Sequence, residues 1–164
     1  MIAQQLYIQQ NEKPQSCAFT GHRHAYDTFP RTALKKQVQT MIKNGCTVFY
    51  CGMAQGFDLL AAKIVMKEKK RNPDVKLIAC VPCREQEKYF PAAEKKMYRA
   101  LIQKADECVC LAECYYRGCM QARDRYMADN AQAMIAYVRK ETGGAAYTAG
   151  YFAKKYPYKP LILL

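Results

Sequence analysis

Apolar residues along this chain gather into short continuous runs that alternate with longer stretches of mixed polarity. The short runs are rich in β-branched and aromatic side chains and show little polar alternation, which is typical of strands buried on both faces of a sheet. They predict strands at residues 16–20, 46–50, 75–81, 107–111, 133–138 and 159–164.

The stretches between these runs carry apolar residues at helical spacing. In the first of them, Leu34, Val38 and Met41 fall on one helical face, and Pro30 is well placed to open the helix. The same spacing predicts further helices over residues 59–70, from 91 through 101, over 120–129 and from 143 to 156.

This alternation of strands and helices predicts the fold class. Buried strands joined by helices form a parallel sheet covered on both faces, and right-handed crossovers wind the helices onto its two sides. We therefore expect an α/β fold, a Rossmann-like three-layer sandwich with a mostly parallel, doubly wound sheet. Residues 16–164 would form a single domain, and residues 1–15 would be a polar lead-in or an extra edge strand.

The formal net charge of +12 is high for 164 residues. Many of the lysines fall in the predicted helices, so they are most simply solvated outer faces, although they also permit attraction to nucleic acid or to anionic metabolites. No apolar run approaches the roughly 20 residues of a membrane span, and the first residues lack an apolar signal region. We therefore expect a cytoplasmic protein that does not enter a membrane.

The nine cysteines are an odd number scattered through apolar runs, which favours reduced, buried thiols over a disulfide framework. Cys80 and Cys83 form a C-x-x-C pair, and four more cysteines follow at 108, 110, 114 and 119. A zinc site needs four converging ligands, whereas Cys80 and Cys108 fall within predicted buried strands. We therefore expect no metal site and no required cofactor.

Unusual loops follow four of the predicted strands. In a parallel sheet the carboxyl ends of the strands meet at one edge, and ligands of doubly wound folds bind there. The loops at residues 20–24, 51–58, 82–86 and 140–144 all fall at this edge. The sequence therefore predicts a ligand site at the carboxyl edge of the sheet.

The loop from Cys51 to Asp58 lies between a strand and a helix and contains Gly52, Met53 and Gly56. Its glycines let the backbone turn sharply and approach a ligand, and the N–H groups of the following helix favour a phosphate. A tight turn with no ligand is the alternative. Asp58 lies in the first helical turn, where it either caps the helix or accepts hydrogen bonds from ribose hydroxyls.

Other polar residues at this edge are suited to a phosphorylated ligand. Thr20, Gly21, His22 and Arg23 combine a hydroxyl, a flexible turn, an imidazole that titrates near neutral pH and a guanidinium that can bind phosphate through two hydrogen bonds. Gln86 is a candidate amide reader of a base or ribose. Ordinary surface polarity is the alternative for each of them.

The predicted helix near residue 123 begins with a dense group of charges. Arg123 shares a face with Met127, so its side chain could project into the site, and Asp124 and Asp129 could pair with the neighbouring arginines. An ion-paired helix surface with no role in binding is the alternative interpretation.

Taken together, these pieces resemble the SLOG superfamily, and within it the small YpsA-like branch. The matching pieces are Thr20–Arg23, Gly52–Asp58 with Ala61–Ala62, Val81–Pro82 with Gln86, Arg123–Met127 with Asp129, and Gly143–Gly144 leading into Tyr151–Ala153. The same superfamily includes the Lonely-Guy phosphoribohydrolases and the Rossmann-like core of the DNA-processing protein DprA.

The resemblance implies a Rossmann-like sheet that binds a nucleotide-derived ligand such as an ADP-ribose or NAD-like molecule. Carried over onto this sequence, the pocket would be lined by Gly21, Arg23, Gly52, Gly56, Asp58, Arg123, Gly143 and Gly144. Lonely-Guy enzymes carry a Gly-Gly-x-Gly-Thr-x-x-Glu pattern whose glutamate takes part in cleaving an N-glycosidic bond. The corresponding run here ends at Gly150, without that glutamate, which leaves Asp58, Arg123 and Asp124 as the catalytic candidates and the question of turnover open.

Three functions follow, in order of preference. The first is that of a bacterial or phage-type protein that binds a small nucleotide-derived ligand. Such a protein would act in nucleotide signalling or in a stress response. The second is hydrolysis of a nucleoside 5′-monophosphate at its N-glycosidic bond, and the third is DprA-like binding of single-stranded nucleic acid. Self-association into a homo-oligomer stays open.

Overall fold

The computed structural model describes residues 13–24 and 29–164, so the lead-in predicted for residues 1–15 lies almost entirely outside the described residues. The strands are β1 (Ser16–Gly21), β2 (Val48–Cys51), β3 (Lys76–Val81), β4 (Glu107–Cys110), β5 (Ala133–Tyr137) and β6 (Leu161–Leu163). The α-helices are α2 (Arg31–Lys43), α3 (Phe57–Lys69), α4 (Ala92–Lys104), α5 (Cys119–Asn130) and α6 (Gly144–Lys155). A 3-10 turn, η1 (Gln86–Tyr89), follows β3.

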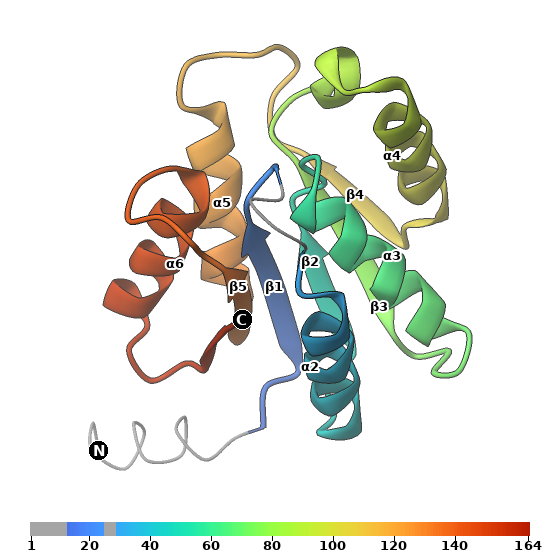
Figure 1. The fold of residues 1–164 in the computed structure, drawn as a ribbon, viewed down its shortest axis with the longest axis vertical. Helices are drawn as coiled ribbons and strands as arrows, with labels where there is room; N and C mark the ends of the chain where they lie inside the picture. The colour runs from blue at the N-terminus through green and yellow to red at the C-terminus, as the bar shows by residue number, and fades with distance from the viewer. Residues whose placement is uncertain (1–12, 25–28) are drawn as a thin grey trace.

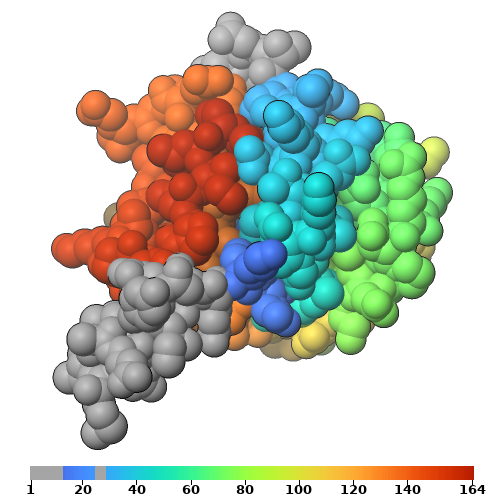
Figure 2. Space-filling model, turned by 90° about the horizontal axis from the view of Figure 1, so that it is seen from below, coloured from blue at the N-terminus to red at the C-terminus, as the bar shows by residue number. Residues whose placement is uncertain are grey.

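The described strands form one sheet in the order β4-β3-β2-β1-β5-β6, and every neighbouring pair is parallel. Helices α2, α3 and α4 cover one face, and α5 and α6 cover the other (Figure 1). This is the predicted Rossmann-like sandwich, and the alternation of runs in the sequence is confirmed as the signal of a doubly wound sheet. Figure 2 shows that the early and late parts of the chain lie side by side, because β1 pairs with β5.

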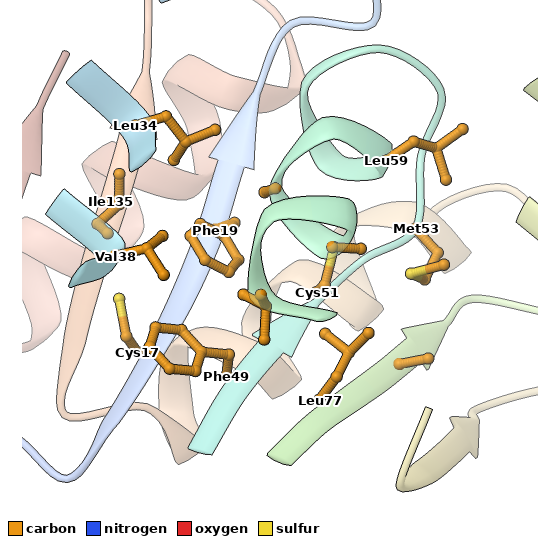
Figure 3. Packing of buried hydrophobic residues seen from close by; sticks show 14 of the residues in the cluster. Cys17, Phe19, Leu34, Val38, Phe49, Cys51, Met53, Leu59, Leu77 and Ile135 are labelled. Carbon is orange, nitrogen blue, oxygen red and sulfur yellow. The ribbon is translucent and has the colours of Figure 1, made fainter. Parts of the chain in front are cut away.

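The core is built on the central strand β1. Phe19 stacks on Phe49 of β2 with ring centroids 5.8 Å apart, and both rings pack under Leu34 and Val38 of α2 (Figure 3). Ala18, which points to the opposite face, belongs to a second cluster under α5 and α6. Both faces of β1 are therefore buried under helices, which explains why its sequence shows no alternation of apolar and polar residues.

Two local predictions are corrected by the structure. Helix α3 begins at Phe57 rather than at residue 59, so Asp58 is its second residue. The strand β4 lies at the edge of the sheet, where Cys108 and Cys110 are exposed rather than buried. The thiols of the interior strands, such as Cys17 and Cys80, are buried as expected.

The chain changes direction across the sheet at β1. Strands β2, β3 and β4 extend to one side of it, whereas β5 and β6 lie on the other. A doubly wound sheet leaves a crevice at the carboxyl ends of the strands at such a switch point. Among the described helices, none is both long and apolar enough to cross a membrane.

Candidate functional site

A cleft lies at the carboxyl edge of the sheet and has two lobes that share Arg23, Ala54 and Met120. We call the larger one, of about 550 Å³, the aromatic lobe, because Tyr89, Phe90 and Tyr115 line it. The other, of about 420 Å³, is the polar lobe. Its walls include residues 20–24, Asp58, Arg123, Asp124, Lys140 and Gly143–Gly144.

The structure brings most of the sequence-predicted site residues to this cleft. Thr20, Gly21, His22, Arg23, Asp58, Arg123, Asp124, Gly143 and Gly144 line the polar lobe. Gln86 lines the aromatic lobe. Gly52 and Met53 are buried behind the cleft, and Gly56 faces a separate hollow beside α4.

Gly56 holds the β1 loop against the start of α3. Its φ of +80° lies in the region that glycine tolerates, and a Cβ at this position would overlap the carbonyl oxygen of Arg23. Its N–H donates to Glu94 Oε2 at 2.8 Å, and the N–H of Phe57 donates to the carbonyl of His22 at 3.1 Å. The expectation that Gly56 offers its N–H to a phosphate is therefore wrong, because α4 supplies the acceptor.

Gly52 presents its carbonyl oxygen to two side chains at the back of the cleft. Its carbonyl oxygen accepts hydrogen bonds from Arg123 Nη1 and from Gln86 Nε2, the latter at 3.1 Å. A Cβ at Gly52 would lie 2.9 Å from Arg123 Cζ and 2.9 Å from Asp58 Oδ2. The neighbouring Met53 is fully buried at a φ of 57°, a conformation that is rare and strained for a residue with a side chain.

Arg123 is turned inward and is only 3% exposed. Its Nε donates to Asp124 Oδ1 at 2.7 Å, and its Nη1 also reaches the Cys80 carbonyl at 3.4 Å. Most of its donors are therefore used to fix β2, β3 and α5 together. The predicted pairing of Asp124 with an arginine is confirmed. Arg123 lines the polar lobe as predicted, with its guanidinium already bonded to neighbouring protein groups.

Asp58 is the buried carboxylate of the polar lobe. The residue is 6% exposed, and its Oδ2 accepts the N–H of Ala54 at 3.3 Å. Its Oδ1 is enclosed and has no hydrogen-bond partner in the part of the chain that the structure describes. Burial raises the pKa of Asp58 to about 7, against the opposing attraction of Arg123. This carboxyl group can therefore both accept and donate a hydrogen bond near neutral pH.

His22 connects two loops that form the wall of the polar lobe. Its Nε2 accepts the N–H of Arg139 at 2.7 Å, so a neutral ring carries its proton on Nδ1. Burial lowers the pKa of His22 from its ordinary value, and the charges of Lys140 and Arg139 lower it further. The imidazole is therefore neutral at physiological pH and ties the loop after β1 to the loop after β5.

The N-terminus of α6 opens into the polar lobe. Gly143 precedes the helix at a φ of +98°, the first turn contains no acidic residue, and no side chain of residues 13–24 and 29–164 caps it. A Cβ at Gly143 or at Gly144 would meet no atom of the described residues within 4 Å. The first-turn N–H groups of a helix have no partner within the helix, and they create a positive end that favours anions.

Sequence reasoning missed the aromatic wall of the cleft. Tyr89 is 88% exposed and Tyr115 is 70% exposed, and both lie in the loops that follow β3 and β4. Lys140 of the polar lobe was also missed as a site residue. Their positions just after predicted strands were the available signal, since residues there share the carboxyl edge with the glycine loops.

The remaining motif residues lie away from the cleft and join α5 to α6. Asp129 Oδ1 accepts hydrogen bonds from Tyr151 at 2.9 Å, from Tyr156 at 2.6 Å and from Lys155 at 3.0 Å. The prediction that Asp129 pairs with an arginine is therefore wrong, because α6 presents a lysine to it. Within the described ranges, no group of three or more His, Cys, Asp or Glu side chains is arranged to hold a metal ion.

The all-parallel sheet with a cleft at its switch point defines a Rossmann-like α/β protein. Residues 16–160 match the YspA SLOG family, YpsA, and the chain belongs to that family. A UPF0398 protein of Halalkalibacterium halodurans is 25% identical over 143 residues, which are 85% of this chain and 76% of that protein. The SPbeta prophage-derived protein YoqJ of Bacillus subtilis is 29% identical over 120 residues, 66% of this chain and 70% of that protein.

Solved structures share the fold at low sequence identity. DNA processing protein A of Helicobacter pylori, whose structure describes a single-stranded DNA binding mode, aligns with a TM-score of 0.66 at 21% identity over 94% of this chain and 66% of that one. The Streptococcus pneumoniae protein of the same name aligns with a TM-score of 0.65 at 18% identity over 90% of this chain. This chain spans only 49% of the Streptococcus pneumoniae protein.

Proposed function

We propose that the cleft binds a nucleotide or nucleotide-derived ligand of the ADP-ribose or NAD-like class, with phosphate in the polar lobe and the base in the aromatic lobe. One observation carries the proposal. A single cleft joins two features to a pocket lined by aromatic rings: a helix N-terminus that no described side chain caps, and a buried carboxylate oxygen with no partner among the described residues.

The polar lobe offers two kinds of attraction for phosphate. The N-terminus of α6 presents backbone donors, and Gly143 and Gly144 leave the space above them open. Arg23 is exposed and lines both lobes, so its guanidinium can reach a phosphate from the place where the two lobes meet. Lys140 adds a further positive charge to the same wall.

Asp58 is placed to receive a sugar hydroxyl. An enclosed acceptor left without a hydrogen bond costs about 1–3 kcal/mol, and a hydroxyl donor from a ligand would remove that cost. Because Asp58 lines the polar lobe beside the shared residue Ala54, a ribose there would lie between the phosphate and the base. The aromatic lobe then offers Tyr89, Phe90 and Tyr115 as surfaces for a base.

Glycosidic cleavage is left out of this proposal. The position that matches the Lonely-Guy glutamate is Gly150, which is exposed on α6 and carries no side chain. Asp58 could move a proton at neutral pH, but the role proposed for it here is to accept a hydrogen bond from a sugar hydroxyl.

Calorimetric titration of the protein with ADP-ribose, NAD and AMP tests the proposal. We expect Arg23→Ala to weaken binding roughly 10- to 100-fold, the size of a lost charge-assisted contact. Arg99→Ala is the matched control, because it removes the same charge from α4 at an exposed residue outside the cleft. No binding by the wild-type protein, or equal losses in the two variants, would overturn the proposal.

A second candidate function is binding of single-stranded nucleic acid, which the exposed rings of Tyr89 and Tyr115 favour. Bases stack on such rings, and the net charge of +12 would attract the backbone. The Helicobacter pylori relative in fold binds single-stranded DNA. Fluorescence anisotropy of a labelled oligothymidine should then show affinity that falls steeply with salt and that Tyr115→Ala reduces. No binding at low salt excludes this candidate.

A further inference from the structure

We infer that Gln86 determines base specificity in the aromatic lobe, and that it selects bases carrying an exocyclic amino group. The inference rests on the proposed function, since it concerns the base of the nucleotide placed there. Its physical origin is the way in which Gly52 and Arg123 fix the orientation of one amide.

The amide of Gln86 has only one allowed orientation. Its nitrogen donates to the Gly52 carbonyl oxygen at 3.1 Å, and the same oxygen accepts from Arg123 Nη1. A carbonyl oxygen can only accept, so exchanging the amide nitrogen and oxygen would set two acceptors against each other. Because the buried Arg123 holds Gly52 from behind, Gln86 must turn its own oxygen away from Gly52.

The side-chain oxygen of Gln86 is therefore an acceptor whose hydrogen bond remains unmade within the described part of the chain. Gln86 lines the aromatic lobe, and its Oε1 is enclosed without a hydrogen-bond partner among residues 13–24 and 29–164. Two cations of the same lobe make other contacts. Arg84 pairs with Glu113 at 2.9 Å, and the Lys88 ammonium lies 5.5 Å from the centroid of the Tyr89 ring.

Chemistry identifies the group that would fill this place. Adenine and cytosine carry amino groups on their edges, and guanine carries one beside its keto oxygen, whereas thymine has no amino group and offers only keto oxygens as acceptors at its exocyclic positions. A base that lies on the aromatic rings satisfies this oxygen with its amino group when the Gln86 amide shifts towards the lobe, because the oxygen is enclosed as the structure stands. A base without that group leaves the oxygen unpaired and binds more weakly.

The test compares two nucleotides that differ only in the amino group, AMP and purine riboside 5′-monophosphate. We expect the wild-type protein to prefer AMP by roughly 10- to 100-fold in calorimetric titrations. Gln86→Met keeps the length of the side chain without its polar atoms, so it should lose this preference by weakening AMP alone. Gln55→Met is the matched control, since Gln55 lines the same lobe, and it should keep the preference.

The outcomes separate this inference from the proposed function. Equal wild-type affinity for the two nucleotides, or an unchanged preference in Gln86→Met, overturns the role of Gln86 while nucleotide binding stands. Failure of both nucleotides to bind overturns the proposed function as well. The wild-type comparison needs no variant, so it decides the point even if Gln86→Met folds poorly. Thermal melting checks that variant, which should fold because the Gly52 carbonyl keeps its bond to Arg123.

Discussion

The N-termini of α3 and α6 begin in the same way and end up with opposite properties. Each follows a strand at the carboxyl edge of the sheet, and each is preceded by a glycine of positive φ, +80° at Gly56 and +98° at Gly143. At α3, protein groups accept hydrogen bonds from the backbone N–H groups. Glu94 accepts from the Gly56 N–H, and the His22 carbonyl oxygen accepts from the Phe57 N–H. At α6, no side chain in the described part of the chain caps the helix, and no described atom fills the space above its first turn.

The difference shows that a glycine-rich turn does not by itself make an anion site. What decides is whether neighbouring elements deliver acceptors to the turn. The turn before α3 receives them from α4 and from the loop after β1, so its glycines serve packing. The turn before α6 receives none from a side chain of the described residues, which is why the proposed phosphate is placed there.

The largest effect that would break this comparison is a change at Gly56. Gly56→Ala would place a Cβ on the Arg23 carbonyl oxygen at a positive φ, and we expect a loss of about 3–5 kcal/mol of unfolding free energy. Gly144→Ala, in open space at α6, should change stability little. Urea denaturation measures both, and equal losses would mean that the two turns are alike.

The pH dependence of the free energy of unfolding next tests the turn before α3, which contains the buried Asp58. Asp58 has a pKa of about 7 when folded, against an ordinary 3.8, so the folded protein holds a proton that the unfolded chain has already released. Stability should therefore fall as pH rises from about 4 to about 7, by about 2 kcal/mol between pH 5 and pH 7. Asp58→Asn removes this slope. An identical pH profile in that variant and in the wild type would contradict the burial of Asp58.

Removing the acceptor that α4 supplies should have a smaller effect. Glu94→Ala leaves the Gly56 N–H without its partner, and we expect a loss of about 1–2 kcal/mol in thermal or urea unfolding. Glu141→Ala, an exposed residue near the start of α6, is the control and should lose almost nothing. If Glu94→Ala is as stable as the control, the donors of α3 are not held by α4.

The smallest change in stability is expected from filling the open turn. Gly144→Asp places a carboxylate at the positive end of α6, which should stabilise the helix by about 0.3–1 kcal/mol while excluding phosphate from the polar lobe. Binding of AMP should then fall at least roughly 10-fold, because the carboxylate takes the donors and repels the ligand. Unchanged AMP binding, followed by calorimetry beside a melting curve, would place the phosphate elsewhere.

The fold was predictable because its signals are local. Strands buried on both faces, such as β1, show continuous apolar runs, and the carboxyl-edge rule places Thr20, Asp58 and Gly143 at one site from the sequence alone. Exposure of β4 was not predictable, since edge position depends on strand order and Cys108 looks as apolar as Cys80.

The roles within the site were less predictable because they depend on distant partners. Glu94 is 38 residues from Gly56, and Arg123 is 71 residues from Gly52. No local pattern says that an acid on α4 will reach one glycine or that an arginine on α5 will turn towards another. The aromatic lobe was missed for a similar reason, since Tyr89 and Tyr115 come together only when β3 and β4 lie side by side.

The pairing of β1 with β5 has a kinetic consequence. Strands β1 to β4 are neighbours in both sequence and space, whereas Cys17 aligns with Ala133 across the middle of the sheet. Contacts between residues so far apart in the chain form slowly and late. The polar lobe straddles this seam, with Thr20 on one side and Gly144 on the other. A nucleotide bound there would contact both sides of the assembled sheet. It would slow unfolding, and so lengthen the lifetime of the native state, without raising the folding rate.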